Sequence, residues 1–164
     1  MMTADIVATI DFQAAVAFIW READLLDARE YQAWLALWTE TGHYVIPVNR
    51  DTTDYAGTLN IAYDNGAMRE ARVKRLQSGL AMSATSAART VRTVSRFVAD
   101  AGEPGAIVIR CAQHIVEQKR DVQRIVAADV TYRIVNSGAG LALDEKVIRL
   151  IDADEAQHGI GYLL

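Results

Sequence analysis

Side chains that could bind a metal are few in this sequence and widely spaced. The histidines are His43, His114 and His158. His114 and Glu117 have an H-x-x-E spacing, but on a strand these two positions point to opposite faces, so their side chains would diverge. An iron site of two histidines and one carboxylate would also need His43 or His158 to converge on His114. We therefore expect this chain to bind no metal and no other cofactor.

The single cysteine, Cys111, lies in a run of alternating apolar residues. It shares its parity with Ile107 and Ile109, which predicts a buried apolar thiol rather than a nucleophile. The sequence carries no C-x-x-C, HExxH, P-loop or GxSxG motif. One cysteine also excludes an internal disulfide and fits a reducing compartment.

One form of acid–base catalysis is left open by the residue types. Two helices over a curved sheet can enclose a cone-shaped pocket, where a buried Asp or Tyr with a shifted pKa acts as an acid or base. The candidates are Tyr44, His114, Asp129 and Tyr132. Asp129 and Tyr132 have opposite parity on their predicted strand, so they should not share a pocket unless a bulge intervenes. The alternative is an ordinary filled core, with no catalytic residue in this chain.

Composition describes one globular domain, 1–164, with 1–10 as a possible disordered tail. Of its 164 residues 51% are apolar and 23% charged, which is enough to build a core. The net charge of −4, without a basic stripe, argues against nucleic acid as a partner. No apolar run approaches the ~20 residues of a membrane span, and the acidic start does not resemble a signal peptide. We expect a cytoplasmic protein that binds no membrane.

The stretch that begins at Asp11 is predicted to form a helix. Asp11 can accept hydrogen bonds from the free N–H groups of the first turn. Apolar residues then repeat at helical spacing: Phe12, Ala15, Val16, Ile19, Ala23 and Leu26. The charged residues Arg21, Glu22 and Asp24 are placed off this stripe. The pattern breaks at 27–29, where the helix should end.

A second, shorter helix is predicted from the apolar residues Tyr31, Trp34, Leu35 and Trp38. Trp34 and Trp38 are four apart on one helical face, so both are expected in the core. Thr41 and Gly42 fit a helix exit, and 43–46 is then a strand that Pro47 ends, because proline cannot donate to a ladder.

The middle of the chain is predicted to be a loop and a basic helix. Residues 48–66 are polar, with a short strand at 59–63, and 67–79 reads as a helix with Gly79 as its stop. This helix carries Arg69, Arg72, Lys74 and Arg75. These cations indicate a solvated helix face, or alternatively a patch that faces a partner.

From 89 onward the apolar pattern changes to a period of two, which predicts strands. The runs are 89–99, 106–118, 123–135 and 141–153. Short polar turns between them favour an antiparallel meander, because parallel strands need crossover helices. Helices followed by a sheet give an α+β fold.

Several stretches together resemble the small (β) subunit of bacterial aromatic-ring-hydroxylating dioxygenases. The segment EADLLDAREYQAWLALW is similar to that family's E-A-x-L-L-D-x-x-x-Y-x-x-W-L, and RVKRLQSG to its R-V-x-R-L-x-T/S-G. The matching residues of the first segment are Glu22, Leu25, Leu26, Asp27, Tyr31, Trp34 and Leu35. Tyr44 and Pro47 fit a Y-x-x-P strand, and the resemblance extends over essentially the whole chain.

This resemblance implies a cone of the nuclear transport factor 2 type (NTF2-like), with helices packed on a curved, mainly antiparallel sheet. It also implies a non-catalytic, structural chain that forms a homotrimer and joins a large (α) subunit in an α3β3 assembly. The large subunit would hold a Rieske 2Fe-2S cluster and a mononuclear iron, and a reductase would supply electrons from NADH for O2-dependent dihydroxylation of aromatic substrates. A Rieske centre needs two cysteines and two histidines, which one cysteine cannot supply.

Two alternatives on the same fold remain open. The chain could be a stand-alone isomerase or dehydratase of the ketosteroid isomerase type, using the candidate residues of the cone, or a small-ligand-binding protein. A filled cone would favour the subunit, and an open pocket with a buried carboxylate of shifted pKa would favour the enzyme. The apolar residues Tyr162, Leu163 and Leu164 are expected to be docked against the sheet or a neighbouring subunit.

Overall fold

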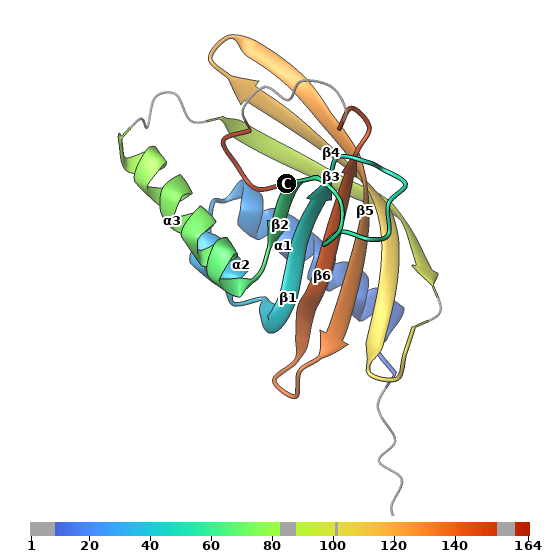
Figure 1. Cartoon of the computed structure of the whole chain (residues 1–164). Coiled ribbons are helices and arrows are strands. Elements are labelled where there is room, and N and C mark those ends of the chain that lie inside the picture. Colours follow the sequence, from blue (N-terminus) through green and yellow to red (C-terminus); the bar gives the residue numbers. More distant parts are fainter. Residues whose placement is uncertain (1–8, 83–87, 101, 154–159) are drawn as a thin grey trace, which may run out of the picture.

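Helices lie against one face of a large twisted sheet (Figure 1). The computed structural model describes residues 9–82, 88–100, 102–153 and 160–164, so most of the predicted tail 1–10 lies outside the described residues. In the described part the helices are α1 (Phe12–Asp27), α2 (Tyr31–Leu35) and α3 (Gly66–Met82). The strands are β1 (Trp38–Pro47), β2 (Asn60–Asp64), β3 (Arg89–Asp100), β4 (Ala106–Lys119), β5 (Val122–Asn136) and β6 (Leu141–Leu150). The predicted α+β fold is confirmed.

The sheet has the order β2-β1-β6-β5-β4-β3. Strands β3 to β6 form the predicted antiparallel meander, and β2 pairs antiparallel with β1. Strand β1 pairs with β6 in parallel, and their register sets Tyr44 beside Lys146. Because paired residues of neighbouring strands point to the same face, this parallel pair brings a phenol and an ammonium together.

The two faces of the sheet differ in burial, as the alternation of apolar and polar residues predicts. The inner face, covered by the helices, buries alternate residues of the long strands: Ile109, Cys111 and Ile115 on β4, and Val130, Tyr132 and Ile134 on β5. Arg110 and His114 are exposed on the opposite, outer face. His114 and Glu117 therefore point to opposite sides, as expected for their spacing.

Helix α1 begins as the sequence predicts. Asp11 is its N-cap, and the carboxylate accepts a 2.9 Å hydrogen bond from the N–H of Ala14. The helix ends at Asp27, and Arg29 takes a left-handed conformation with φ of 58°. This turn connects α1 to α2, and α1 lies behind the sheet in Figure 1.

The prediction of a helix extending to Trp38 is wrong. Helix α2 ends at Leu35, and Trp38 is the first residue of β1. The chain leaves the helix through a tight turn, in which Leu37 N–H donates to Trp34, and Leu143 of β6 then donates to Leu37 over 2.7 Å. Pairing with β6 gives this backbone hydrogen-bond partners in the sheet. These bonds outweigh those that would extend the helix, because a helix this short is not stable alone.

The interpretation of the basic helix as one solvated face is wrong for Arg69 and Arg72, whereas Lys74 and Arg75 are exposed as it predicts. Helix α3 continues through Gly79 to Met82, since one glycine costs only about 1 kcal/mol in a helix. Arg69 is buried and donates to the carbonyl of Gly42, and Arg72 forms an ion pair with Asp64. These two arginines face β1 and β2, so they belong neither to a solvated face nor to a partner-facing patch.

Candidate functional site inside the cone

The carboxylate of Glu22 is the centre of a buried hydrogen-bond network. Trp34 Nε1 donates to its Oε1 over 3.0 Å, and the Tyr132 hydroxyl donates to its Oε2 over 2.9 Å. Lys146 Nζ lies 2.8 Å from Oε1. The Glu22 side chain is 1% exposed. Both carboxylate oxygens are therefore paired with protein donors, as a buried charge requires.

Lys146 reaches the same network from β6, and its side chain is fully buried. Besides Glu22, its ammonium donates to the backbone oxygen of Leu164 over 2.8 Å, and it lies 5.3 Å from the centre of the Tyr132 ring. Burial lowers the pKa of Lys146, and the attraction of Glu22 acts in the opposite direction. A buried positive charge on Lys146 is thus in direct contact with a buried negative charge on Glu22.

Segment 160–164 lies against the inner face of the sheet, and its two leucines belong to the hydrophobic core. Leu163 and Leu164 are each 1% exposed. The Leu164 N–H donates to the Tyr44 hydroxyl over 3.0 Å, and Arg92 donates to the backbone oxygen of Leu163. The Tyr162 hydroxyl donates to Glu117 Oε2 over 2.6 Å. The expectation that these residues are docked is confirmed, and the dock is the chain's own interior.

The phenols of this interior are held in their neutral form. Burial raises the pKa of Tyr132 well above its ordinary value, and the charge of Glu22 raises it further. Burial also raises the pKa of Tyr44, against a smaller opposite effect of the bond from Leu164. Both hydroxyls and the Glu22 carboxylate are engaged by protein partners. The arrangement suits a structural polar network that orders α1, β1, β5 and β6.

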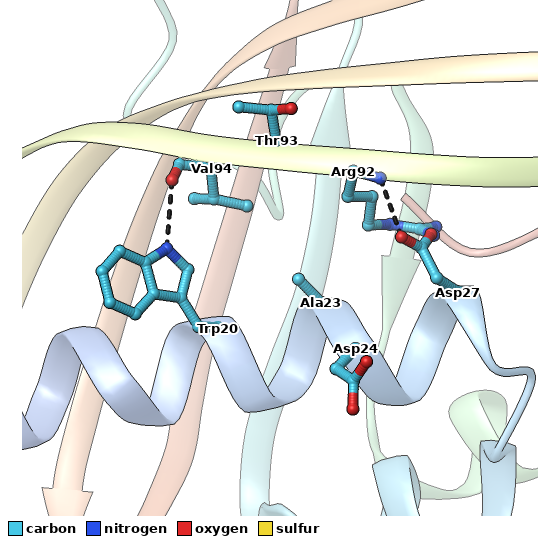
Figure 2. A pocket seen from close by; sticks show the side chains of 7 residues that line it. All are labelled: Trp20, Ala23, Asp24, Asp27, Arg92, Thr93 and Val94. Atoms are coloured by element: carbon cyan, nitrogen blue, oxygen red, sulfur yellow. Dashed lines mark hydrogen bonds and ion pairs between the residues drawn. The ribbon is translucent and has the colours of Figure 1, made fainter.

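A surface groove between α1 and β3 has a volume of about 320 Å³. Figure 2 shows that its polar side chains close the free edge of β3: Trp20 Nε1 donates to the Val94 carbonyl over 3.1 Å, and Asp27 accepts from the Arg92 N–H over 2.7 Å. An edge strand leaves such groups without ladder partners. The groove is therefore lined by groups that fasten the helix to the sheet edge.

The family follows from a direct comparison with known proteins. Residues 21–154 match the family described as the ring hydroxylating beta subunit. The chain belongs to this family. Its resemblance to the β subunits of aromatic-ring-hydroxylating dioxygenases is thereby confirmed.

Relatives and solved structures agree with this assignment. The chain is 30% identical, over 82% of its length and 78% of the relative's, to the β subunit of biphenyl 2,3-dioxygenase from Rhodococcus jostii RHA1. The β subunit of benzoate 1,2-dioxygenase from Burkholderia mallei has the same fold, with a TM-score of 0.80, 20% identity and coverage of 95% of this chain and 99% of that one. An NTF2-like protein with a cystatin-like fold from Novosphingobium aromaticivorans has a TM-score of 0.63 at 17% identity, covering 87% of this chain and 82% of that one. The NTF2-like fold is confirmed.

The β subunit does not bring its four candidate acid–base residues together. Tyr44 and Tyr132 lie in the cone, whereas His114 and Asp129 lie on the outer face. Asp129 accepts hydrogen bonds from Arg96 and, over 2.8 Å, from Arg50. The bond from Arg96 lowers the pKa of Asp129. Asp129 and Tyr132 thus point to opposite faces of the sheet, as their opposite parity predicts.

Two residues of the buried network were missed from the sequence. Glu22, placed off the apolar stripe, is in fact on it, three positions after Ile19 and four before Leu26. Lys146 was not singled out, although it shares the parity of Ile148 and Leu150 on β6. In both cases the spacing indicates a buried position, whereas the charged residue type indicates an exposed one.

The remaining titratable candidates that the structure describes show no metal-binding arrangement. Among the described residues, no group of three His, Cys, Asp or Glu side chains is placed to hold a metal ion, and His158 lies outside those residues. Cys111 is buried as predicted, and burial raises the pKa of its thiol to about 12. No described helix is both long and apolar enough to cross a membrane.

Proposed function

We propose that this β subunit is architectural: it supports a Rieske-type large subunit and performs no redox chemistry itself. The observation that carries the proposal is the occupied interior. Leu163 and Leu164 lie where an enzyme or ligand-binding protein with this fold would need an open pocket. Glu22 is a buried carboxylate, but Trp34, Tyr132 and Lys146 occupy its oxygens. These contacts disfavour a stand-alone isomerase or dehydratase.

The assembly we propose is an α3β3 hexamer built around a trimer of β subunits. Its support is an apolar patch on the outer face of the sheet, which we call the outer patch: Val91, Val116, Ile125 and Ile151. Val91 pairs with Val116 and Val116 with Ile125 across neighbouring strands. Val91, Ile125 and Ile151 are 67%, 68% and 64% exposed. Contiguous exposed apolar side chains favour an interface, and closed cyclic symmetry is a common way to bury one.

The chemistry of the assembly is assigned to the large subunit. We propose that it holds a Rieske 2Fe-2S cluster and a mononuclear iron, and that it dihydroxylates an aromatic substrate with O2 and electrons from NADH. The relatives are subunits of biphenyl and benzoate dioxygenases, which supports an aromatic substrate. We propose that the protein is cytoplasmic, because Cys111 is a buried free thiol and the large subunit would receive electrons from NADH.

The test is a reconstitution in which one component is omitted at a time. A cognate large subunit, its reductase, NADH and an aromatic substrate are assayed for O2 uptake with and without the β subunit. We expect uptake to require the large subunit, and the β subunit alone to consume no O2 with any substrate. Turnover by the β subunit alone, or an isomerase activity lost in Tyr132→Phe, would overturn the proposal.

The outer patch is tested by a matched pair of substitutions. Ile125 and Val122 both lie on β5 and are 68% and 66% exposed, but their odd and even positions point to opposite faces of the sheet. Ile125→Asp should abolish assembly, and Val122→Asp should leave it intact. Equal effects of the two substitutions would remove the outer patch from the proposed interface.

A further inference from the structure

We propose that the interior of the cone is a peptide-binding site, which segment 160–164 of this chain occupies by placing Leu163 and Leu164 among Tyr44, Arg92 and Lys146. The ligand class is a short peptide with two consecutive leucines after an aromatic residue. The same sequence, Ile-Gly-Tyr-Leu-Leu, would bind in trans when the chain's own segment is displaced.

The interior of the cone binds main-chain atoms of the segment. Lys146 donates to the Leu164 oxygen over 2.8 Å, and Tyr44 accepts from the Leu164 N–H over 3.0 Å. Arg92 donates to the Leu163 oxygen. These three groups come from β6, β1 and β3, so they surround the segment from across the sheet. Donors and an acceptor placed against main-chain groups are a common means of peptide recognition.

The interior also contacts the side chains of the segment. Leu163 and Leu164 are each 1% exposed within the hydrophobic core. The Tyr162 hydroxyl donates to Glu117, which Arg124 also contacts at 3.1 Å. The two buried leucines and the Tyr162 hydroxyl would give this site its selectivity, while the main-chain bonds fix the direction of the peptide.

Each cation that contacts the segment also has an anionic partner outside it. Lys146 is held by Glu22 at 2.8 Å, and Glu22 is fixed in turn by Trp34. Arg92 forms an ion pair with Asp27, and its side chain is 1% exposed. Because these bonds do not involve the segment, we expect the site to stay organised when the segment leaves. A preorganised site loses less free energy on binding.

None of the contacts depends on covalent continuity with the segment. Tyr44 and Leu164 are 120 positions apart in the sequence, and the interaction between them is an ordinary hydrogen bond. The attached segment competes at the high effective concentration of an intramolecular ligand. Binding in trans therefore becomes measurable only when the chain's own segment is weakened.

The experiment uses the full chain with Leu163→Asp and Leu164→Asp, since two buried carboxylates would expel the segment. Isothermal titration with Ile-Gly-Tyr-Leu-Leu should give one site per chain, with a dissociation constant on the order of micromolar. The peptide should also raise the melting temperature of the variant. A control peptide with both leucines replaced by aspartate should do neither.

A second variant separates specific recognition from general apolar binding. Tyr44→Phe, added to the first two substitutions, removes the acceptor of the Leu164 N–H and should weaken binding of the peptide about three- to tenfold. Tyr63→Phe is the matched control, because Tyr63 stacks on His43 at the outer face. Equal effects of the two substitutions, or equal binding of both peptides, would overturn the proposal.

Failure of the variant to fold does not end the test. The variant is then refolded from urea with either peptide, and recovery with Ile-Gly-Tyr-Leu-Leu alone supports the site. Recovery with neither peptide contradicts it. The titration contains no large subunit, so its outcome is independent of whether the chain assembles as proposed.

Discussion

Lys146 Nζ lies 2.8 Å from Glu22 Oε1, and neither side chain is more than 1% exposed. A buried ion pair of this kind contributes little net stability, but removing one partner leaves an uncompensated charge. The consequence is that the two residues should be strongly coupled in their effect on the free energy of unfolding.

Lys146→Met should lower the free energy of unfolding by about 3–5 kcal/mol. Adding Glu22→Gln removes the second charge. Its amide oxygen can accept from Trp34 and its NH2 can donate to the Tyr132 hydroxyl oxygen, so the double variant should be more stable than Lys146→Met alone. Urea denaturation of the single and double variants gives the coupling energy. Additive losses would show that the pair is not coupled.

Alkaline pH should unfold the protein, because its buried tyrosines ionise more readily in the unfolded chain than in the fold. The unfolded chain ionises its phenols near the ordinary pKa of 10.0, whereas Tyr44 and Tyr132 have raised values in the fold. Above this pH, unfolding releases protons, so the free energy of unfolding falls as pH rises. Lys146, with a lowered pKa, contributes the opposite slope, but only up to its unfolded value of 10.5.

The measurement follows tyrosinate absorbance and circular dichroism together during a pH titration. Tyr44 and Tyr132 should ionise only in the unfolding transition itself. Full ionisation of all six tyrosines while the native spectrum persists would contradict the burial of these two phenols.

Trp34 should be a determinant of folding rather than of assembly. It is fully buried, lies edge-to-face with Tyr44 at 5.9 Å and donates to Glu22. Trp34→Ala should cost about 3–5 kcal/mol, a large share of the ~5–15 kcal/mol of a typical domain. Trp20→Ala, at a site 54% exposed, is the control and should cost much less. A soluble Trp34→Ala protein with an unchanged melting temperature and lost partner binding would reverse the assignment.

Arg69 should stabilise the junction between α3 and β1. It is 2% exposed, donates to the carbonyls of Gly42 and Thr39, and lies 4.1 Å from the Trp38 ring centre. Arg69→Met should lower the free energy of unfolding by about 2–4 kcal/mol, because buried carbonyls lose their donor. Arg75→Met, exposed on the same helix, should stay within about 0.5 kcal/mol. Similar losses at both positions would show that Arg69 has no special role.

The sheet was predictable because its pattern is local. Alternation in β4 and β5 assigns each residue to a face, and short turns dictate antiparallel pairing, so the opposite faces of Tyr132 and Asp129 followed from parity alone. The parallel pairing of β1 with β6 was not predictable in this way. It joins residues about 100 positions apart, and no periodicity in either strand specifies the partner.

The buried network was missed for a physical reason. Charged residues are rarely buried, so Glu22 was assigned to the surface despite its helical spacing. Its burial is tolerated because Lys146 and Tyr132 supply partners from strands more than 100 positions away. Trp38 was placed in a helix because its spacing from Trp34 fits one. The competing strand pairing with Leu143 comes from β6, far along the chain.

We propose that this β subunit is a structural partner of a large subunit. The most direct measurement is the mass of the complex, by light scattering on material in which both chains are co-expressed and purified through a tag on the large subunit alone. The account predicts a single species with the mass of α3β3 and equimolar chains. A large subunit that purifies without this chain, beside a β subunit that remains a monomer at high concentration, would contradict it.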